Sequence, residues 1–168
     1  LSMRVTYIRG MNKLDPKTRK LIIRCLVEGQ SIRATARTAD VSKNTVTKLL
    51  AEAGEACVEL HDELVRNVPA KRIQCDEIWS FTYAKQRSVA TAKAAPDGAG
   101  DTWTWTALDA DSKLIVSYLV GGRDAEYAAE FMHDLRSRLR NRVQLTTDGH
   151  RPDLESEEGV LGADVDFA

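Results

Sequence analysis

Cysteine is scarce in this chain of 168 residues: three copies, at positions 25, 57 and 75, stand far apart. Their spacing fits neither a C-x-x-C pair nor a Cys/His zinc site, so a zinc-bound fold is excluded. We expect all three thiols to be reduced and mostly buried. No apolar run is long enough to span a membrane, and the N-terminus lacks the residue order of a signal peptide. A cytoplasmic location without membrane contact is expected.

Internal repeats and low-complexity tracts are missing too, and the net charge is only -1. The charge is nevertheless unevenly distributed. Residues 1–72 hold 14 Lys and Arg against 8 Asp and Glu (net +6), whereas residues 73–168 hold 10 against 17 (net -7). This asymmetry favours a basic module that contacts polyanion, joined to an acidic body that holds cations. A solvated basic surface is the alternative.

The basic module is predicted to be helical. Asp15-Pro16 is a helix-start signal, and the helix that follows is expected to end near Gly29. Two further helices are expected over residues 31–38 and from Ser42 to about 53, each opened by a serine that can cap. The apolar spacing of the last helix continues to about residue 66, and Val68-Pro69 then breaks it. We therefore predict a linker over residues 67–72.

The second and third helices have the spacing of a helix-turn-helix. Ala36 is small enough for the two helices to approach, and Val41 can plug the turn, where Asp40 stands at the usual place of glycine. A three-helix bundle with a solvated basic face is the alternative. If the motif binds DNA, base edges and phosphates would be contacted by polar and basic side chains: Lys43, Asn44, Thr45, Thr47, Lys48, Arg33 and Arg37.

The acidic body opens with a predicted strand over residues 73–81, where Asp76 stands in a run that otherwise indicates a buried strand. An unpaired carboxylate taken out of water costs several kcal/mol, so Asp76 needs a partner. Side chains alternate along a strand, which puts Asp76 and Glu77 on opposite faces. Two interpretations stay open for Asp76: an acid held by a neighbouring Lys or Arg, or a metal ligand.

Four further strands and one long helix are expected in the body. The strands cover residues 102–108, 114–120, 143–147 and 163–167, and the helix begins after Asp124. The segment 84–100 is expected to be a loop or a splayed hairpin, whose basic residues either contact nucleic acid or are simply solvated. A right-handed crossover would set the fourth strand beside the first in parallel. Asp76 and Asp148 would then lie side by side, and two carboxylates that close suit Mg²⁺ or Mn²⁺.

Three motifs lie at these strands: Cys75-Asp76-Glu77-Ile78-Trp79 on the first strand, Ala107-Leu108-Asp109 before the third and Thr147-Asp148-Gly149-His150 after the fourth. They resemble those of bacterial insertion-sequence transposases of the DDE class. The resemblance covers nearly all of the chain. It implies a helix-turn-helix domain (1–66) that binds the terminal inverted repeats, a linker (67–72) and a ribonuclease-H-like catalytic domain (73–168). It further implies Mg²⁺- or Mn²⁺-dependent cleavage and transfer of double-stranded DNA, by a nucleoid-associated homo-oligomer.

By the same resemblance, Asp76 and Asp148 are the first two metal-binding, catalytic acids, and His150 supports the site through a hydrogen bond. The family's third acid belongs on a helix after the fifth strand, and the sequence ends at Ala168 before such a helix. Glu155, Glu157 and Glu158 precede that strand and are interpreted as a solvated helix face. We therefore expect weak metal binding and little or no activity. A transposase and a non-catalytic, transposase-derived DNA-binding protein that represses or inhibits transposition both remain open.

Overall fold

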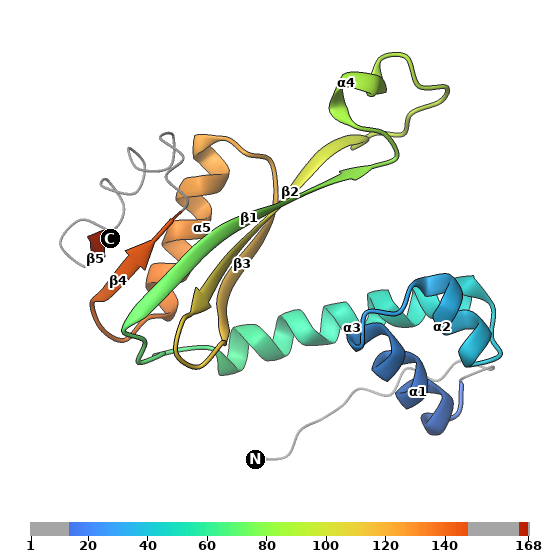
Figure 1. The fold of residues 1–168 in the computed structure, drawn as a ribbon, viewed down its shortest axis with the longest axis horizontal. Helices are drawn as coiled ribbons and strands as arrows, with labels where there is room; N and C mark the ends of the chain where they lie inside the picture. The colour runs from blue at the N-terminus through green and yellow to red at the C-terminus, as the bar shows by residue number, and fades with distance from the viewer. Residues whose placement is uncertain (1–13, 148–164, 168) are drawn as a thin grey trace. The chain divides into compact units, whose positions relative to one another are not determined.

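The chain forms two compact units, Leu1–His61 and Asp62–Ala168, in a mixed α/β arrangement. The structure is a computed structural model that describes residues 14–147 and 165–167 (Figure 1). The first unit is helical and the second is built on a sheet. The roles predicted for the two parts, DNA binding and catalysis, stay predictions.

Three helices make up the described part of the first unit: α1 (Pro16–Val27), α2 (Ile32–Thr38) and α3 (Lys43–Leu64), whose last turn belongs to the second unit. The predicted caps are all present. Asp15 accepts hydrogen bonds from the backbone N–H groups of residues 17 and 18, and Ser31 and Ser42 accept one each from residues 34 and 45. These side chains satisfy N–H groups that a helix start leaves without partners, which fixes where each helix begins.

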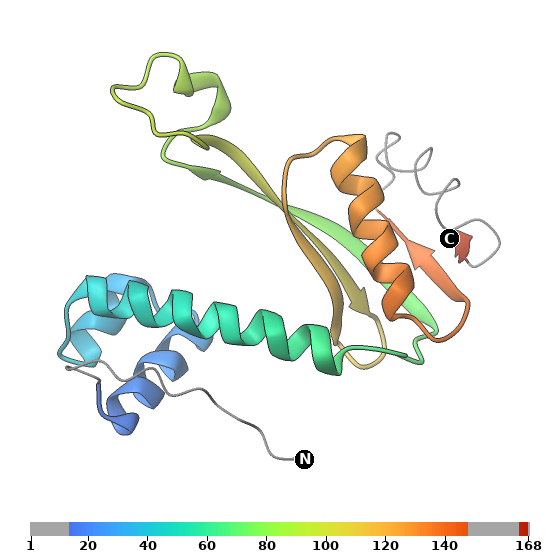
Figure 2. The same ribbon diagram turned by 180° about the vertical axis from the view of Figure 1, so that it is seen from behind.

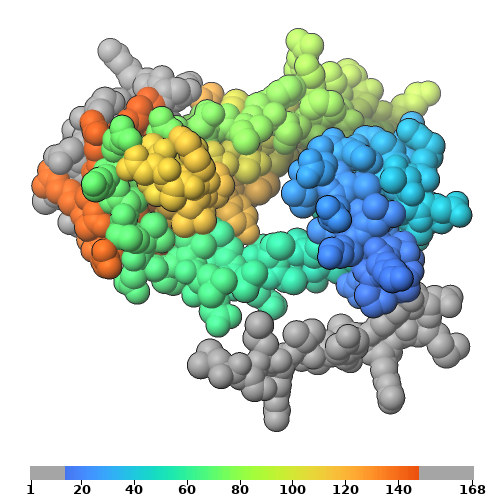
Figure 3. Space-filling model, turned by 60° about the horizontal axis from the view of Figure 1, so that its bottom comes forward, coloured from blue at the N-terminus to red at the C-terminus, as the bar shows by residue number. Residues whose placement is uncertain are grey.

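A small apolar core holds these helices together. Each helix contributes to it, through Ile22 of α1, Ala36 of α2, and Val46 and Leu49 of α3, all of them buried. The space-filling view shows the surfaces of α1, α2 and the start of α3 as one continuous mass (Figure 3, blue to cyan). Ala36, expected to let the two helices approach, is thus buried in this core, and Val41 of the turn packs against it.

The second unit contains a five-stranded sheet of order β3-β2-β1-β4-β5. Its strands are β1 (Arg72–Thr82), β2 (Gly100–Asp109), β3 (Ile115–Gly121), β4 (Val143–Thr146) and β5 (Val165–Phe167). The first three are antiparallel neighbours, and β4 pairs with β1 in parallel, as the crossover rule predicted. The sheet is therefore mixed, with β1 at its centre.

Helix α5 (Ala125–Arg138) covers one face of this sheet (Figure 2). Asp124 caps it by accepting from the N–H groups of residues 126 and 127. Its apolar stripe is buried against the strands: Ala128, Phe131, Met132, Leu135 and, just past the helix, Leu139. The segment 84–100, expected to be a loop, also contains the short helix α4 (Gln86–Val89).

Residues 67–72, expected to be a linker, are packed into the second unit. Val68 and Ala70 are buried members of its core, and Arg72 already belongs to β1. The backbone of Val68 also forms a bridge with Leu139, in which its N–H donates to Arg138 O and its carbonyl accepts from Arg140 N. Helix α3 ends at Leu64, and the apolar residues on either side of Pro69 belong to the core of the second unit.

Two further expectations concern burial and membranes. Of the three free cysteines, Cys25 is buried and Cys75 is half-buried, whereas Cys57 is exposed on α3, so the expectation of mostly buried thiols is only partly met. Over residues 14–147 and 165–167, none of the helices has the length and apolar character needed to cross a membrane.

Candidate functional site

Asp76 lies in the middle of β1 and is exposed, which corrects the expectation of a carboxylate in a buried strand. It points to the face of the sheet opposite α5, the face it shares with Gln74 and Ile78. Its Oδ1 accepts a hydrogen bond from the backbone N–H of Glu77 at 2.8 Å. No described Lys or Arg forms an ion pair with it. Asp76 therefore has carboxylate lone pairs available to solvent or to a cation.

The enclosed acid of β1 is Glu77, on the α5 side. Its side chain is only 8% exposed, and its Oε2 accepts a hydrogen bond from Arg123 Nη2 at 2.7 Å. The guanidinium of Arg123 also lies over the ring of Trp103, with its Cζ 4.4 Å from the ring centroid. Such stacking and charge pairing offset the cost of enclosing the carboxylate. One interpretation of Asp76 was a carboxylate on the strand paired with a neighbouring Lys or Arg. Such a pair is found one residue later, between Glu77 and Arg123.

A small pocket lies next to Asp76 and reaches to the end of β4. Asp76 and Thr147 both line it, which brings residue 147 close to the middle of β1 although the two are 71 positions apart. The rest of the lining comes from β1, β2 and the apolar stripe of α5: Cys75, Glu77, Trp105, Ala128, Phe131 and Met132. The pocket therefore lies between the centre of β1, the end of β4 and helix α5.

The parallel pairing of β1 and β4 has a fixed register. Arg72 pairs with Gln144, Ile73 with Leu145, and Gln74 with Thr146, so each pair is separated by 72 positions. Asp148 and His150, predicted at the metal site, lie outside the described residues, as do Glu155, Glu157 and Glu158. Within the described part of the chain, no cluster of three or more His, Cys, Asp or Glu could hold a metal ion.

The residues predicted to bind DNA are solvent-facing in the first unit, with one exception. Arg33 and Arg37, one turn apart on α2, are exposed, and so are Lys43, Asn44, Thr47 and Lys48 at the start of α3. Thr45 is half-buried, and its hydroxyl is 2.9 Å from the hydroxyl of the capping Ser42. Lys48 lies 4.0 Å from Glu52, a pair exposed enough to be weak.

The turn between α2 and α3 closes with two backbone hydrogen bonds, from Val41 N to Ala36 O at 3.0 Å and from Asp40 N to Arg37 O at 3.4 Å. Asp40 has a φ of 51°, the left-handed conformation predicted from its place in the turn. This geometry ends α2 at Thr38 and allows α3 to begin at Lys43.

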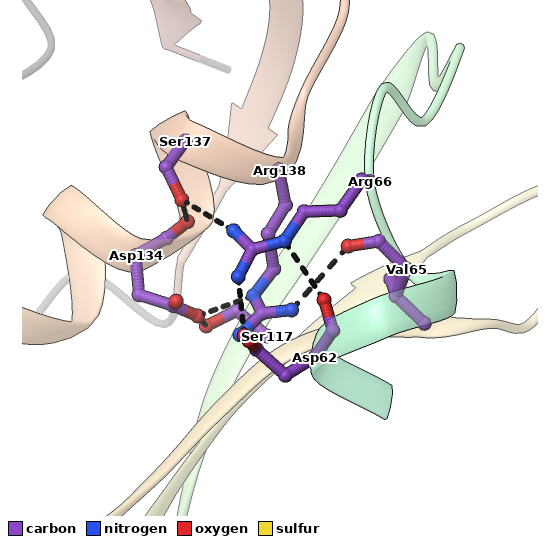
Figure 4. Close-up of polar contacts among 7 residues, drawn as sticks. All are labelled: Asp62, Val65, Arg66, Ser117, Asp134, Ser137 and Arg138. Carbon is purple, nitrogen blue, oxygen red and sulfur yellow. Dashed lines mark hydrogen bonds and ion pairs between the residues drawn. The ribbon is translucent and has the colours of Figure 1, made fainter. Parts of the chain in front are cut away.

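A network of charged side chains in the second unit was not foreseen (Figure 4). Arg138 is 8% exposed, and its Nε donates to Asp134 Oδ2 at 2.6 Å while its Nη2 donates to Asp62 Oδ1 at 3.0 Å. Ser117 donates to the same Asp134 oxygen at 2.6 Å. Asp62, which lies in the last turn of α3, also accepts a hydrogen bond from Arg66 Nη2. The guanidinium of Arg138 is therefore engaged in hydrogen bonds within the second unit.

Comparisons with known proteins add little to this geometry. A scan against protein-family models and a search of curated proteins found no match. Among solved structures, the chain has a weak likeness to the crystal structure of the Mos1 mariner paired end complex with Mn, with 17% identity and a TM-score of 0.36. The match covers 95% of this chain but only 61% of that one. A likeness this low carries no argument about the site.

Proposed function

We infer that this chain is a DNA transposase of the DDE class, in which a helix-turn-helix unit binds element ends and a ribonuclease-H-like unit cleaves and transfers DNA strands. The resemblance of the motifs around Asp76 and Asp148 suggests the class. The described geometry supports it through the sheet, the exposed carboxylate on its central strand and the basic helices of the first unit. Cytoplasmic, nucleoid-associated action as a homo-oligomer belongs to the same proposal.

The observation that carries the proposal is the register of β1 and β4. Every described pair of these strands is separated by 72 positions, and Asp76 and Asp148 are separated by the same number. Thr147, the residue before Asp148, lines the same pocket as Asp76. We therefore propose that Asp148 follows β4 directly beside Asp76, so that two carboxylates meet at one point of the sheet.

Two adjacent carboxylates repel each other unless a cation lies between them, and their oxygens suit Mg²⁺ or Mn²⁺. Asp76 fits this role because it is exposed and unpaired by any described Lys or Arg. When bound, such ions activate an attacking oxygen and stabilise the leaving oxygen of a phosphodiester. The contribution of the chain is to fix Asp76, whose Oδ1 is held by the backbone N–H of Glu77. His150 is proposed to orient this site through a hydrogen bond.

The DNA-binding part of the proposal rests on the first unit. Helix α3 begins with exposed Lys43, Asn44 and Thr47, and α2 exposes Arg33 and Arg37 one turn apart. A helix N-terminus that presents polar side chains is the element that enters a major groove in helix-turn-helix proteins. Because the hydroxyl of Thr45 is engaged with the cap at Ser42, Thr45 is the least suited of the predicted residues to read bases.

The experiment measures metal binding directly and then DNA nicking. Mn²⁺ binding is followed by electron paramagnetic resonance of free Mn²⁺ in the wild type and in the Asp76→Asn and Asp148→Asn variants. We expect weak binding that falls at least about tenfold in either variant, since each removes one of the ligands. Asp97→Asn, which removes an exposed acid from the loop 84–100, is the matched control and keeps wild-type affinity.

Nicking is assayed with a duplex that carries the element end, in Mg²⁺ and in Mn²⁺. Because the site has two acids at most from these motifs, we expect little nicking, and what is present must vanish in Asp76→Asn. Wild-type Mn²⁺ affinity in both carboxylate variants would contradict the proposed site. Tight duplex binding that is lost in Arg37→Ala with Lys43→Ala, without any metal dependence, would identify a non-catalytic DNA-binding protein instead.

A further inference from the structure

The outer half of the β1–β2 hairpin leaves the rest of the sheet. Pairing of β2 with β3 stops at Trp103, and pairing of β1 with β4 stops at Gln74. Beyond the pair formed by Trp79 and Trp103, β1 and β2 are therefore paired only with each other among the described strands. Figure 1 shows them running past β3 and α5 to carry α4 at the tip. Residues 79–103 are called the arm below.

The face of the sheet that forms the core continues onto this arm without cover. A helix of 14 residues such as α5 is about 21 Å long, whereas a strand of 11 residues such as β1 spans about 36 Å. Trp105 is buried under the helix, 5.8 Å from the ring of Phe131. On the same face further out, Trp79 and Phe81 are 40% and 47% exposed, with ring centroids 5.8 Å apart.

Cations accompany the aromatic rings of the arm. Lys85 Nζ lies 4.9 Å from the ring centroid of Trp79, and Arg123 lies over Trp103 at the base of the arm. The arm holds three basic residues (85, 87 and 93) against two acids (97 and 101). This local excess stands out because the sequence from residue 73 onward has a net charge of -7. Positive charge and exposed rings thus coincide at one end of an acidic unit.

We propose that the arm binds single-stranded DNA, with bases stacking on Trp79 and Phe81 and with Lys85 and Arg87 contacting the phosphates. Exposed aromatic rings flanked by cations are the chemistry of sequence-tolerant single-strand binding. Aromatic rings are also enriched in protein interfaces, but Lys85 lies over Trp79 and lysine is depleted from such interfaces, so a protein partner fits less well. A duplex fits less well too, because its bases are stacked on one another and offer no free face. The choice of DNA as the nucleic acid rests on the proposed function.

The test is the affinity of the full chain for a fluorescein-labelled oligothymidylate of about 12 nucleotides, measured by anisotropy in EDTA. We expect Trp79→Ala with Phe81→Ala to weaken binding at least about tenfold, because two stacking platforms are removed. The conservative pair Trp79→Phe with Phe81→Tyr retains aromatic faces and should keep most of the affinity. Ile78→Ala is the matched control: Ile78 is 56% exposed on the same strand, on its opposite face.

A second variant tests the charges at the tip of the arm. Lys85→Glu with Arg87→Glu should weaken binding and make its salt dependence shallower, by about 0.7 in the logarithmic slope for each phosphate that the variant no longer neutralises. Circular dichroism verifies that each variant is folded. If the double alanine variant fails to fold, the other two variants test the proposal. Binding should then be weakened in Lys85→Glu with Arg87→Glu and largely kept in Trp79→Phe with Phe81→Tyr.

Unchanged affinity for oligothymidylate in the folded aromatic and charge variants would overturn the proposal. So would a result in which the aromatic variant loses self-association in analytical ultracentrifugation and keeps its DNA affinity, because the arm would then bind a second copy of the chain. Equal loss of affinity for a duplex would likewise reject a single-strand site. Since the assay is run in EDTA, it does not depend on Asp76. Failure of the arm and failure of the metal-dependent function are therefore distinguishable.

Discussion

The Asp62 carboxylate accepts a hydrogen bond from Arg138 Nη2 at 3.0 Å, which ties the last turn of α3 to the end of α5 across 76 positions of sequence. The same guanidinium donates to Asp134 and, at 3.3 Å, to the backbone carbonyl of Val65. Because Arg138 is 8% exposed and serves three acceptors, its removal would take the charged donor from Asp134 and one of two donors from Asp62, and would remove the side-chain donor to Val65 O.

We expect Arg138→Met to lower the free energy of unfolding of the second unit by about 2 to 3 kcal/mol, less than for a fully buried pair because Asp62 is largely exposed. All three tryptophans, Trp79, Trp103 and Trp105, belong to this unit, so urea denaturation followed by their fluorescence reports on it alone. Arg140→Met, at an exposed arginine two residues later, is the control and should change stability by less than about 0.5 kcal/mol. A similar loss of stability in both variants would contradict a specific role for Arg138.

The stability of the second unit should also depend on acid pH. Burial raises the pKa of Asp134, but hydrogen bonds from Arg138 and Ser117 outweigh it and hold the pKa below the usual 3.8. The folded unit therefore binds this proton less readily than the unfolded chain does. The stabilisation is present above pH 3.8 and is lost as the pH falls through the lowered pKa.

The Asp134→Asn variant should therefore have a lower free energy of unfolding than the wild type at neutral pH. Below about pH 4, this free energy should fall less steeply with pH than in the wild type. Tryptophan fluorescence against pH measures both effects. Part of the decline must remain, because the pKa of Asp109 is also lowered, chiefly by the hydrogen bond that its carboxylate accepts from Ser112. An unchanged acid profile in the variant would mean that Asp134 titrates alike in both states.

The turn between α2 and α3 offers a stabilising substitution. Asp40 holds a φ of 51° at the position after the α2 cap, where a residue with a Cβ is strained by roughly 1 kcal/mol and glycine is not. We expect Asp40→Gly to stabilise the first unit by about 0.5 kcal/mol, since glycine also gains freedom in the unfolded chain. Thermal melting by far-ultraviolet circular dichroism measures the shift. Asp40→Ala keeps the strain and should bring no gain.

Thr35 is a second position in the first unit where a substitution should be stabilising. Its side chain is fully buried, and within the described residues its Oγ1 has no hydrogen-bond partner. Valine has nearly the same shape without the hydroxyl, so Thr35→Val should raise the free energy of unfolding by about 1 kcal/mol. The control is Thr38→Val, at an exposed position of the same helix, with an expected change below about 0.5 kcal/mol. A loss of stability in Thr35→Val would reveal that the hydroxyl is satisfied in solution.

The starts of the helices could be predicted from the sequence, whereas the pairing of distant residues could be predicted only in part. Capping residues such as Asp15 and Asp124 fixed the helix starts, and the handedness of crossovers gave the parallel pairing of β1 and β4. The face of β1 covered by α5 could not be assigned, because alternation separates Asp76 from Glu77 without saying which of them faces the helix. The ion pair between Arg138 and Asp62 was equally hidden, since no local pattern relates residues 76 positions apart.

Neutralising Glu77 and neutralising Asp76 should have opposite effects on stability and on Mn²⁺ affinity. Glu77→Gln removes the charge that pairs with Arg123 in a nearly enclosed position, and we expect it to destabilise the second unit by about 1 to 2 kcal/mol while leaving Mn²⁺ affinity unchanged. Asp76→Asn removes an exposed charge and should alter stability by less than about 0.5 kcal/mol while weakening Mn²⁺ binding. Tryptophan fluorescence in urea and resonance of free Mn²⁺ measure the two quantities on the same samples. If Asp76→Asn were instead the destabilising variant, its carboxylate would be needed for the strand itself, and the case for a metal ligand at this position would fail.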